Sequence, residues 1–238
     1  MRSRSVVVVG CSRGIGLGVM RHLADNPVCA ALVGVVRKSE DEQRLKELFL
    51  GFPNVLIVRG DVTDKVSMDN VARVVTSAGI VPDLLLCNAG VLTEPVGVLD
   101  IQDSDMRLSF DVNVLGPLHT MTAFLPLMRN VEGAVIVNVS SGWGLRGAVG
   151  QSTYCASKHA LEGLMKCVAD ETAADPVSVV TVRPGMVFTE MLAVAEGSVE
   201  RARENGVPVD LFVPQFCEKI FSIGKDSSGT HVDCGLRK

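Results

Sequence analysis

Tyr154 and Lys158 are the pair of residues whose types and spacing most directly suggest chemistry. Tyr154 is the single tyrosine of the chain, and Lys158 follows it by one turn of a predicted helix. A free phenol has a pKa of about 10, and a cation at about 4 Å, with an effective permittivity of about 20, is worth about 4 kcal/mol. We therefore expect Lys158 to lower the pKa of Tyr154. Since such pairs also occur on ordinary helix surfaces, the assignment needs support from the rest of the chain.

A glycine-rich turn leads from the first predicted strand into the first predicted helix. Glycines without a Cβ let backbone N–H groups and the N-terminus of a helix approach a pyrophosphate closely. The alternative is a tight packing turn that binds nothing, because the spacing departs from the common G-x-G-x-x-G fingerprint. The turn predicts a dinucleotide site that includes Gly10, Ser12, Arg13, Gly14, Ile15 and Gly16.

The residues after the second predicted strand favour NADP(H) over NAD(H). In NAD-binding versions of such a site, an acidic residue accepts the ribose 2′-hydroxyl, whereas here Arg37 and Lys38 stand in that region. A guanidinium binds a 2′-phosphate with paired hydrogen bonds, and Arg13 in the glycine-rich turn can reach the same phosphate. The alternative for Arg37 and Lys38 is a solvated strand end.

The third predicted strand leads into Asp61 and Val62. The Asp61 carboxylate can accept a hydrogen bond from an adenine amine. Its alternative role is to cap the next helix, although Thr63 or Asp64 can do this better.

Predicted strands and helices alternate along the whole chain, and this order indicates the fold that positions these residues. Short β-branched runs alternate with helical stretches, which predicts βαβ units, a Rossmann-type doubly wound parallel α/β sheet of about seven strands, and helices on both faces. The predicted strands are 5–9, 30–36, 55–59, 84–87, 134–139, 178–183 and 230–233. The predicted helices are 14–25, 40–50, 65–78, 104–129, 152–173 and pieces between 189 and 221. Ligands of such sheets bind beyond the carboxyl ends of the strands, where the sequence places these motifs.

Composition narrows the class of protein. The 238 residues, 47% hydrophobic and 21% charged, suit a single domain spanning 1–238. The net charge of −4 and the lack of basic runs argue against nucleic-acid or membrane partners. Seven scattered cysteines without a Cys-x-x-Cys pair predict reduced thiols, no metal site and a cytoplasmic location.

The ordered motifs carry a family resemblance that covers nearly the whole chain. The matching segments are 10–16, Asp61-Val62, 87–90, Asn113, Ser141, Tyr154 with Lys158, and 183–189. Together they resemble the short-chain dehydrogenase/reductase family, and the runs 12–18, 113–118 and 124–127 are similar to sniffer and C-factor-like carbonyl reductases. The resemblance implies NADPH-dependent reduction of a ketone or aldehyde by hydride transfer.

The resemblance also implies a role for each residue of the chemical centre. Tyr154 is expected to be the general acid and base, and Lys158 to lower its pKa and hold the nicotinamide ribose. Ser141 is expected to steady the substrate oxygen, with Ser140 as its alternative. Asn113 is expected to take part in a proton relay. Pro117 has no N–H for the Asn113 carbonyl, which fits a relay through water as well as an ordinary proline kink.

The remaining implied features concern the cofactor's nicotinamide, the substrate and assembly. The expected nicotinamide-end contacts are Asn88, Ala89, Gly90, Pro184, Gly185, Val187 and Thr189. The segment 189–213 is expected to form a lid over a small carbonyl substrate, and the chain to be a homodimer, a homotetramer or a monomer. Alternatives are a non-catalytic dinucleotide sensor or interaction protein, a 3-oxoacyl or sepiapterin-type reductase, and a sugar-nucleotide enzyme of the extended branch.

Overall fold

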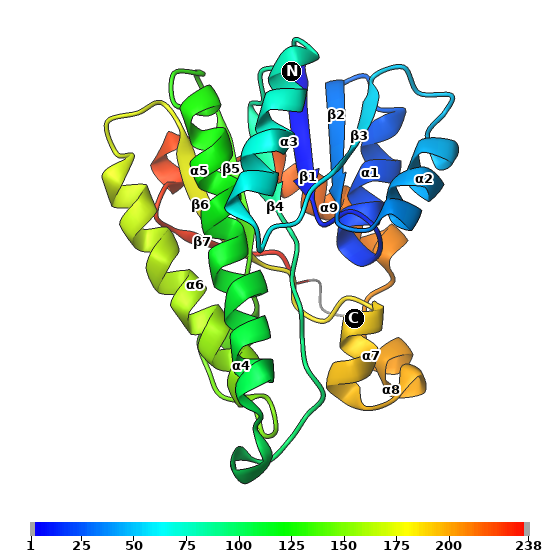
Figure 1. Ribbon diagram of the computed structural model, residues 1–238, viewed down its shortest axis with the longest axis vertical. Coiled ribbons are helices and arrows are strands. Elements are labelled where there is room, and N and C mark those ends of the chain that lie inside the picture. The colour runs from blue at the N-terminus through cyan, green and yellow to red at the C-terminus, as the bar shows by residue number, and fades with distance from the viewer. Residues whose placement is uncertain (1–2, 236–238) are drawn as a thin grey trace.

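A single parallel sheet forms the centre of the molecule, whose computed structural model describes residues 3–235 (Figure 1). Its strand order is β3-β2-β1-β4-β5-β6-β7, and every pairing is parallel. The strands are β1 (Arg4–Val9), β2 (Cys29–Val36), β3 (Val55–Arg59), β4 (Leu84–Cys87), β5 (Val135–Val139), β6 (Ser178–Arg183) and β7 (His231–Asp233). The predicted seven-stranded doubly wound sheet is confirmed.

Helices cover both faces of the sheet because the strands are apolar on both sides. One face is covered by α1 (Gly14–Ala24), α2 (Ser39–Leu48) and α9 (Val209–Phe221), and the other by α3 (Lys65–Ser77), α5 (Gly116–Met128) and α6 (Ser152–Glu171). Each face has its own hydrophobic core, in which Phe212 and Phe216 lie on one side and Phe124 and Met165 on the other. The 3₁₀ turns are Val98–Asp100, Gly142–Gly144 and Lys225–Ser227.

The site-bearing loops meet because β1 and β4 are neighbours in the sheet. Val9 at the end of β1 pairs with Cys87 at the end of β4, and also with Val35 of β2. The chain leaves β1 toward one side of the sheet and β4 toward the other, so a crevice opens between the two following loops. The glycine-rich turn and Asn88 therefore face each other across this crevice.

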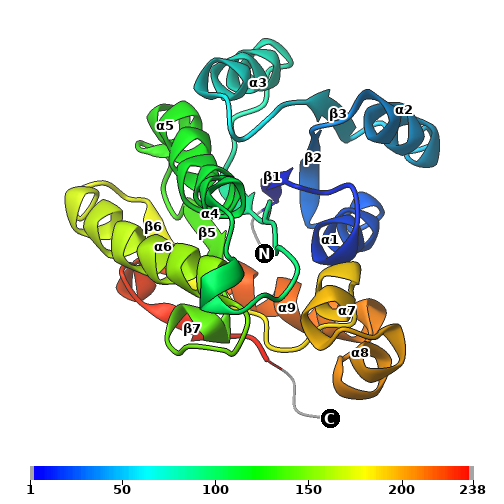
Figure 2. The ribbon, with the colours of Figure 1, turned by 60° about the horizontal axis from the view of Figure 1, so that its bottom comes forward.

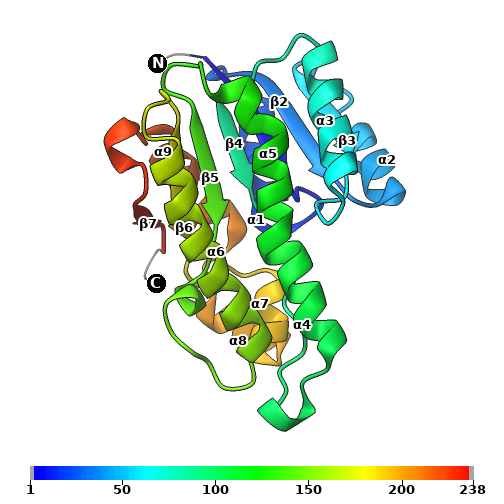
Figure 3. The same cartoon turned by 60° about the vertical axis from the view of Figure 1, so that its left-hand side comes forward.

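The predicted helix 104–129 is not one regular helix. It consists of α4 (Asp103–Phe110), a π-helical turn (Asp111–Leu115) and α5, which continue one another beside α6 (Figure 3). In the π turn the Gly116 N–H donates to the Asp111 carbonyl, and Pro117 follows with no N–H to continue a regular ladder. The turn places Asn113 on the side of the helix that faces the sheet, where it is fully buried.

Two short helices stand out from the sheet below the carboxyl ends of the strands (Figures 1 and 2). They are α7 (Glu190–Glu196) and α8 (Val199–Asn205), capped by the side chains of Thr189 and Ser198. Gly197 joins them in the left-handed conformation, with φ of 65°. A parallel bridge between Val187 and Val207 brings the two ends of this segment together, so residues 189–205 form a helical hairpin that projects from the sheet.

Candidate functional site

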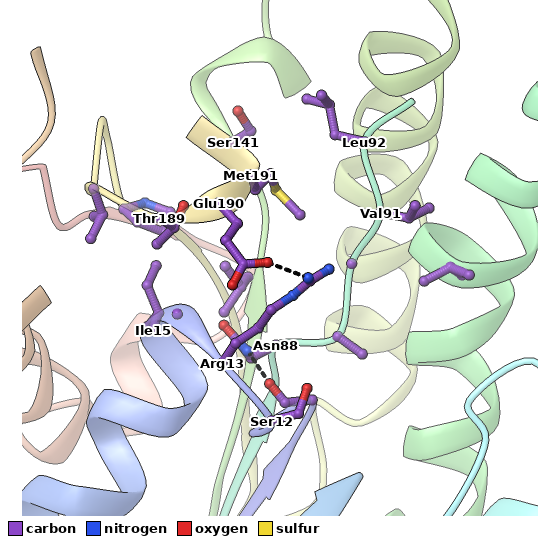
Figure 4. Close-up of a pocket in the computed structure, with 18 of the residues that line it drawn as sticks. Ser12, Arg13, Ile15, Asn88, Val91, Leu92, Ser141, Thr189, Glu190 and Met191 are labelled. Carbon is purple, nitrogen blue, oxygen red and sulfur yellow. Dashed lines mark hydrogen bonds and ion pairs between the residues drawn. The ribbon is translucent and has the colours of Figure 1, made fainter. Parts of the chain in front are cut away.

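A groove of about 1110 Å³ runs along the carboxyl ends of the strands. It is bounded by the glycine-rich turn, the loop after β4, the loop after β5 and the start of α7 (Figure 4). All of the predicted site residues line this groove except Gly16 and Asn113. The chain therefore brings motifs from all three thirds of its length into one continuous cavity.

The glycine-rich turn is held tightly against the loop after β4. A Cβ on Gly10 would lie 2.6 Å from the backbone of Ala89, and Gly10 has φ of +85°. The Asn88 side chain donates a 2.7 Å hydrogen bond to the Gly10 carbonyl. Gly16 lies beneath the turn rather than in the groove, since its Cβ would meet the Gly10 carbonyl at 2.4 Å. Gly10 thus lets the turn pack against the loop after β4, and Gly16 lets α1 pack beneath the turn.

Arg13 bridges the groove instead of pointing to the Arg37 side. Its guanidinium forms an ion pair with the Glu190 carboxylate, the first residue of α7 (Figure 4). Both side chains are largely exposed, at 71% and 70%. Glu190 was not singled out from the sequence, because no local signal indicates that two residues so far apart in the chain will pair.

The other end of the groove presents unpaired cations. Arg37 and Lys38 line it, and within residues 3–235 neither has a hydrogen-bond or ion-pair partner. A third cation that sequence reasoning missed, Arg44 of α2, donates to the Ser12 carbonyl at 2.6 Å and to Asp41 at 2.8 Å. Arg44 thereby ties α2 to the glycine-rich turn.

Asp61 and Val62 form the wall beyond β3. One oxygen of the Asp61 carboxylate already accepts from the Thr63 N–H and hydroxyl, at 2.9 and 2.8 Å. The cap of α3 is Asp64, which accepts from the Val66 N–H. Asp61 is therefore free of the capping role and lines the groove with Val62.

Tyr154, Ser141 and Trp143 meet at the deep end of the groove. Tyr154 lies in the first turn of α6, and its ring packs edge-on against Trp143 with a centroid separation of 6.0 Å. The Ser141 hydroxyl accepts from the Trp143 N–H at 3.2 Å, which holds the 3₁₀ turn beside the tyrosine. Of the two adjacent serines, Ser140 is the more buried, and its hydroxyl has no partner among the described residues.

The pKa of Tyr154 is shifted in the direction opposite to the one that the Tyr-Lys spacing predicts. Burial raises the pKa of Tyr154 to about 12, and the nearby Ser141 hydroxyl offsets this only in part. The Lys158 ammonium lies 5.6 Å from the ring centroid and donates to the Val139 carbonyl at 2.8 Å, and its charge does not overcome the effect of burial. Burial also lowers the pKa of Lys158 to about 8. The pKa of Tyr154 thus lies above that of a free phenol and not below it, because loss of water around the phenol dominates. The role of Lys158 toward Tyr154 stays a prediction.

Asn113 acts on the backbone rather than in the groove. Its side-chain oxygen accepts from the Val91 N–H and its amide donates to the Val91 carbonyl, both at 2.9 Å. The same amide donates to the Ser157 hydroxyl at 3.0 Å. These bonds clamp the loop after β4 to α6, while the Asn113 carbonyl lacks its usual helical partner at Pro117.

The loop after β6 forms the opposite wall. Pro184, Gly185, Val187 and Thr189 all line the groove, and Gly185 has φ of +76° with Gly235 packed against it. The Thr189 hydroxyl accepts from the Leu192 N–H at 3.2 Å, so its own proton remains for a ligand. This wall therefore offers one hydroxyl donor in an otherwise apolar surface.

Other kinds of site were also sought. Within residues 3–235, no group of three or more His, Cys, Asp or Glu side chains is arranged to hold a metal ion. All seven cysteines are free thiols. In the same part of the chain, no helix combines the length and the apolar character needed to cross a membrane.

Comparisons with known proteins agree on one family. The model of the short chain dehydrogenase family matches residues 4–198. An NADPH-dependent pterin aldehyde reductase of Arabidopsis thaliana is 32% identical over 196 residues, or 82% of this chain and 80% of the relative. The NADPH-bound carbonyl reductase from chicken fatty liver has a TM-score of 0.85 at 30% identity, covering 98% of this chain and 97% of that chain. Carbonyl reductase Sniffer of D. melanogaster shares the fold, with a TM-score of 0.87 at 22% identity and coverage of 98% and 97%. The chain belongs to the short-chain dehydrogenase family.

Proposed function

We propose that this chain is an NADPH-dependent carbonyl reductase that converts a ketone or aldehyde into an alcohol. The observation that carries the proposal is a phenol held protonated by burial at the deep end of a dinucleotide-sized groove, with Ser141 and Lys158 beside it. An oxidoreductase of this family requires a proton donor at the place where the carbonyl oxygen is to be bound. Tyr154 is the residue that suits this role.

The groove fits NADP(H). The Gly10 position leaves no room for a side chain, so the backbone of the turn is accessible to a pyrophosphate. Arg37 and Lys38 directly follow β2, where a carboxylate would repel a 2′-phosphate, and both are unpaired within the described residues. The Arabidopsis and chicken relatives are NADPH-dependent and NADPH-bound, respectively. Asn88, Ala89 and Gly90 then lie along the cofactor, with Asp61 and Val62 at its adenine end.

The residues of the chain divide the proton chemistry among them. The bound nicotinamide supplies the hydride. Tyr154 transfers its hydroxyl proton to the substrate oxygen, and the Ser141 hydroxyl donates a hydrogen bond to that oxygen as negative charge develops there. Lys158 places a cation next to the phenolate that Tyr154 becomes, which favours this proton loss during the reaction. The Asn113 carbonyl, without its helical partner, accepts a water that resupplies the proton.

The pKa of Tyr154 favours the reductive direction. A group with a pKa of about 12 is almost fully protonated at neutral pH, so it is ready to act as an acid. Oxidation of an alcohol requires the phenolate as a base, and burial disfavours that form. We therefore propose that Tyr154 enters the reaction as an acid at neutral pH.

The deep end of the groove suits a flat, mostly apolar carbonyl compound. Trp143, Val91, Leu92 and Met191 surround the Tyr154 end, and Trp143 presents an aromatic ring beside the phenol. Planar aromatic carbonyls fill such a site by stacking and by burying apolar surface. The relative from Arabidopsis acts on a pterin aldehyde, which is a planar carbonyl compound. Residues 189–205, which form α7 and α8, carry Met191 and form the lid over this end. Residues 209–213 of the expected lid instead begin α9, with Phe212 and Val213 in the core. The free thiols suit a cytoplasmic location.

The test is consumption of NADPH with a panel of aromatic diketones, quinones, pterin aldehydes, steroids and acyl thioesters. We expect turnover with planar aromatic carbonyls and a loss of about 10²–10⁴-fold in kcat for Tyr154→Phe. Cys155→Ser is the matched control, since Cys155 adjoins Tyr154 but does not line the groove. Full activity of Tyr154→Phe contradicts the assignment of the acid. Silence across the whole panel, with NADPH still bound, favours a dinucleotide sensor.

A further inference from the structure

Lys158 is a buried cation whose hydrogen-bond partner is electrically neutral. It is 3% exposed, and its ammonium donates to the Val139 carbonyl at 2.8 Å. Tyr154 stays protonated in the resting site and therefore brings no negative charge. A buried ammonium without a carboxylate nearby is strongly disfavoured, so the countercharge must come from elsewhere.

Glu162 is the carboxylate in a position to supply it. It lies one turn after Lys158 on α6, and its side chain is only 8% exposed. Both of its oxygens are occupied by the Arg183 guanidinium, with Nε donating at 3.1 Å and Nη2 at 3.2 Å. Arg183 in turn lies 3.7 Å from the Asp233 carboxylate, which is 75% exposed.

These four side chains form a row of alternating charge, which we call the charge row: Lys158, Glu162, Arg183 and Asp233. The row begins at the chemical centre on α6, crosses to β6 and ends at the surface on β7. Its charges sum to zero when all four groups are ionised. Glu162 and Asp233 lie 3.1 and 3.7 Å from Arg183, and Glu162 stands four residues after Lys158 on α6, which is the spacing of neighbours on one helix face.

The ion pair in the middle of the row also connects the two walls of the site. Glu162 lies on the helix that carries Tyr154 and Lys158, while Arg183 directly precedes Pro184 and Gly185 in the opposite wall. Gly144 packs so closely on Glu162 that a Cβ there would meet its Cγ at 3.2 Å and its Oε1 at 3.3 Å. The carboxylate therefore has a single position, fixed by Arg183 and by the loop after β5.

We propose that Glu162, held in place by Arg183, is a positioning residue that keeps Lys158 charged and fixes α6 against the loop after β6. The proposal rests on the proposed carbonyl reduction, since that reaction is what needs the Lys158 cation. Glu162 does not line the groove, so it acts on the reaction through Lys158 and through the placement of α6, without touching a bound ligand.

The titration of Lys158 is where this role becomes measurable. Burial lowers the pKa of Lys158 to about 8, and the charge of Glu162 acts in the opposite direction. The groups around Lys158 are Tyr154 and Glu162, one turn before and one turn after it on α6, and the uncharged Val139 and Asn113. Arg183 on β6 and Asp233 on β7 follow Glu162 further along the row. Among these, only Glu162 and Asp233 favour the protonated lysine, and Glu162 is the nearer in the row. Without Glu162, the loss of the Lys158 proton should move to lower pH.

The experiment measures the Lys158 titration directly, without any substrate. The variant is Glu162→Gln, which keeps the size of the side chain, and the control is Glu171→Gln, an exposed residue of the same helix. The ¹³Cε signal of Lys158, assigned by its loss in Lys158→Met, is followed against pH in the full-length protein. We expect the midpoint to fall by about one unit or more in Glu162→Gln and to stay unchanged in Glu171→Gln. An unchanged midpoint in folded Glu162→Gln overturns the proposal.

Two further variants keep the proposal open to refutation. Glu162→Asp retains the charge, so its midpoint should stay closer to that of the unmodified protein; a fall as large as in Glu162→Gln shows that charge is not the cause. If Glu162→Gln does not fold, Glu162→Met, which is similar in length and uncharged, takes its place. The midpoint should fall in this variant too, and an unchanged value overturns the proposal.

Kinetics then separate this proposal from the proposed function. A one-unit fall in the midpoint lowers the charged fraction of Lys158 at pH 8 by about fivefold and hardly changes it at pH 6. We expect kcat/KM of Glu162→Gln to show that same split. A shifted midpoint in a protein that reduces no carbonyl refutes the reductase assignment but not the charge row. Turnover with an unchanged midpoint refutes the charge row alone.

Discussion

Replacing Glu190 by Gln should strengthen the binding of NADPH and leave the binding of NADH almost unchanged. In this structure Glu190 holds the Arg13 guanidinium across the groove. Arg13 can bind the 2′-phosphate only after it leaves Glu190. The carboxylate therefore competes with the phosphate for the same cation, and removing it removes the competition.

The exposure of the pair sets the size of the effect. Both side chains are largely exposed, at 71% and 70%, so water and salt screen their attraction. Exposed ion pairs contribute about 0–1 kcal/mol. Releasing Arg13 should therefore increase the affinity for NADPH by at most about fivefold. NADH has no 2′-phosphate, so the ratio of the two affinities should rise by the same factor.

The assay is titration of each nucleotide by its fluorescence, at low and at moderate salt. Glu200→Gln is the matched control, since Glu200 is an acidic residue in the first turn of the neighbouring helix α8 and does not line the groove. The gain in Glu190→Gln should shrink as salt rises, because screening weakens the competing pair in the unmodified protein. A companion variant, Arg13→Gln, should lower the affinity for NADPH more than that for NADH.

Two outcomes would refute this reasoning. If Glu190→Gln changes the affinities for NADPH and NADH equally, Glu190 acts on the shared part of the cofactor and not through the phosphate. If Arg13→Gln leaves the ratio of the two affinities unchanged, Arg13 belongs to the lid and the phosphate is held by Arg37 and Lys38 alone.

Two further predictions concern stability. Gly10→Ala should lower the free energy of unfolding in urea by more than about 2 kcal/mol and abolish tight NADPH binding, because its Cβ would lie 2.6 Å from Ala89. The control Gly51→Ala, whose Cβ would have nothing within 4 Å, should change the free energy of unfolding by less than about 0.5 kcal/mol. Burial lowers the pKa of Lys158 from 10.5 to about 8, so the folded state holds this proton less tightly than the unfolded chain does. The resulting loss of stability begins as the pH falls below 10.5 and is complete below pH 8. Lys158→Met should therefore raise the free energy of unfolding at pH 7 by up to about 3 kcal/mol. This gain should disappear as pH rises from 8 to 10.5, and a gain independent of pH would contradict the cause.

The sheet could be predicted from the sequence because its strands are short runs rich in β-branched residues. The run Val6 to Val9 is a continuous apolar stretch with no helical period, which in a parallel sheet indicates burial on both faces, and the strand 178–183 is marked by its three β-branched valines. The break in the helix 104–129 was not predicted. Its cause is a π turn, in which the Gly116 N–H donates to the carbonyl five residues earlier, at Asp111, instead of four residues earlier. The local sequence signal for this turn is Pro117.

The site was predictable as a set of positions, but not as a set of contacts. Parallel strands bring their carboxyl ends to one edge, so Ser141 and the glycine-rich turn had to lie near each other once the strand order was known. The partner of Arg13 could not be predicted in this way, because it depends on the path of α7. The pKa of Tyr154 also escaped prediction, since spacing gives the position of a neighbouring charge but not how much water the fold removes.

The charges around the groove limit how strongly the cofactor can act on α7. In the proposed cofactor position, Arg13 would have to leave Glu190, the first residue of α7, in order to bind the 2′-phosphate, which would couple the phosphate to α7 through one exposed ion pair. A ligand can shift an equilibrium only by the difference in its free energy between the two states, and here that difference is at most about 1 kcal/mol. The phosphate alone can therefore shift the equilibrium between two positions of α7 by no more than about fivefold. A larger closure must come from contacts at the other end of the cofactor, where Thr189 caps α7 and still has a proton to donate.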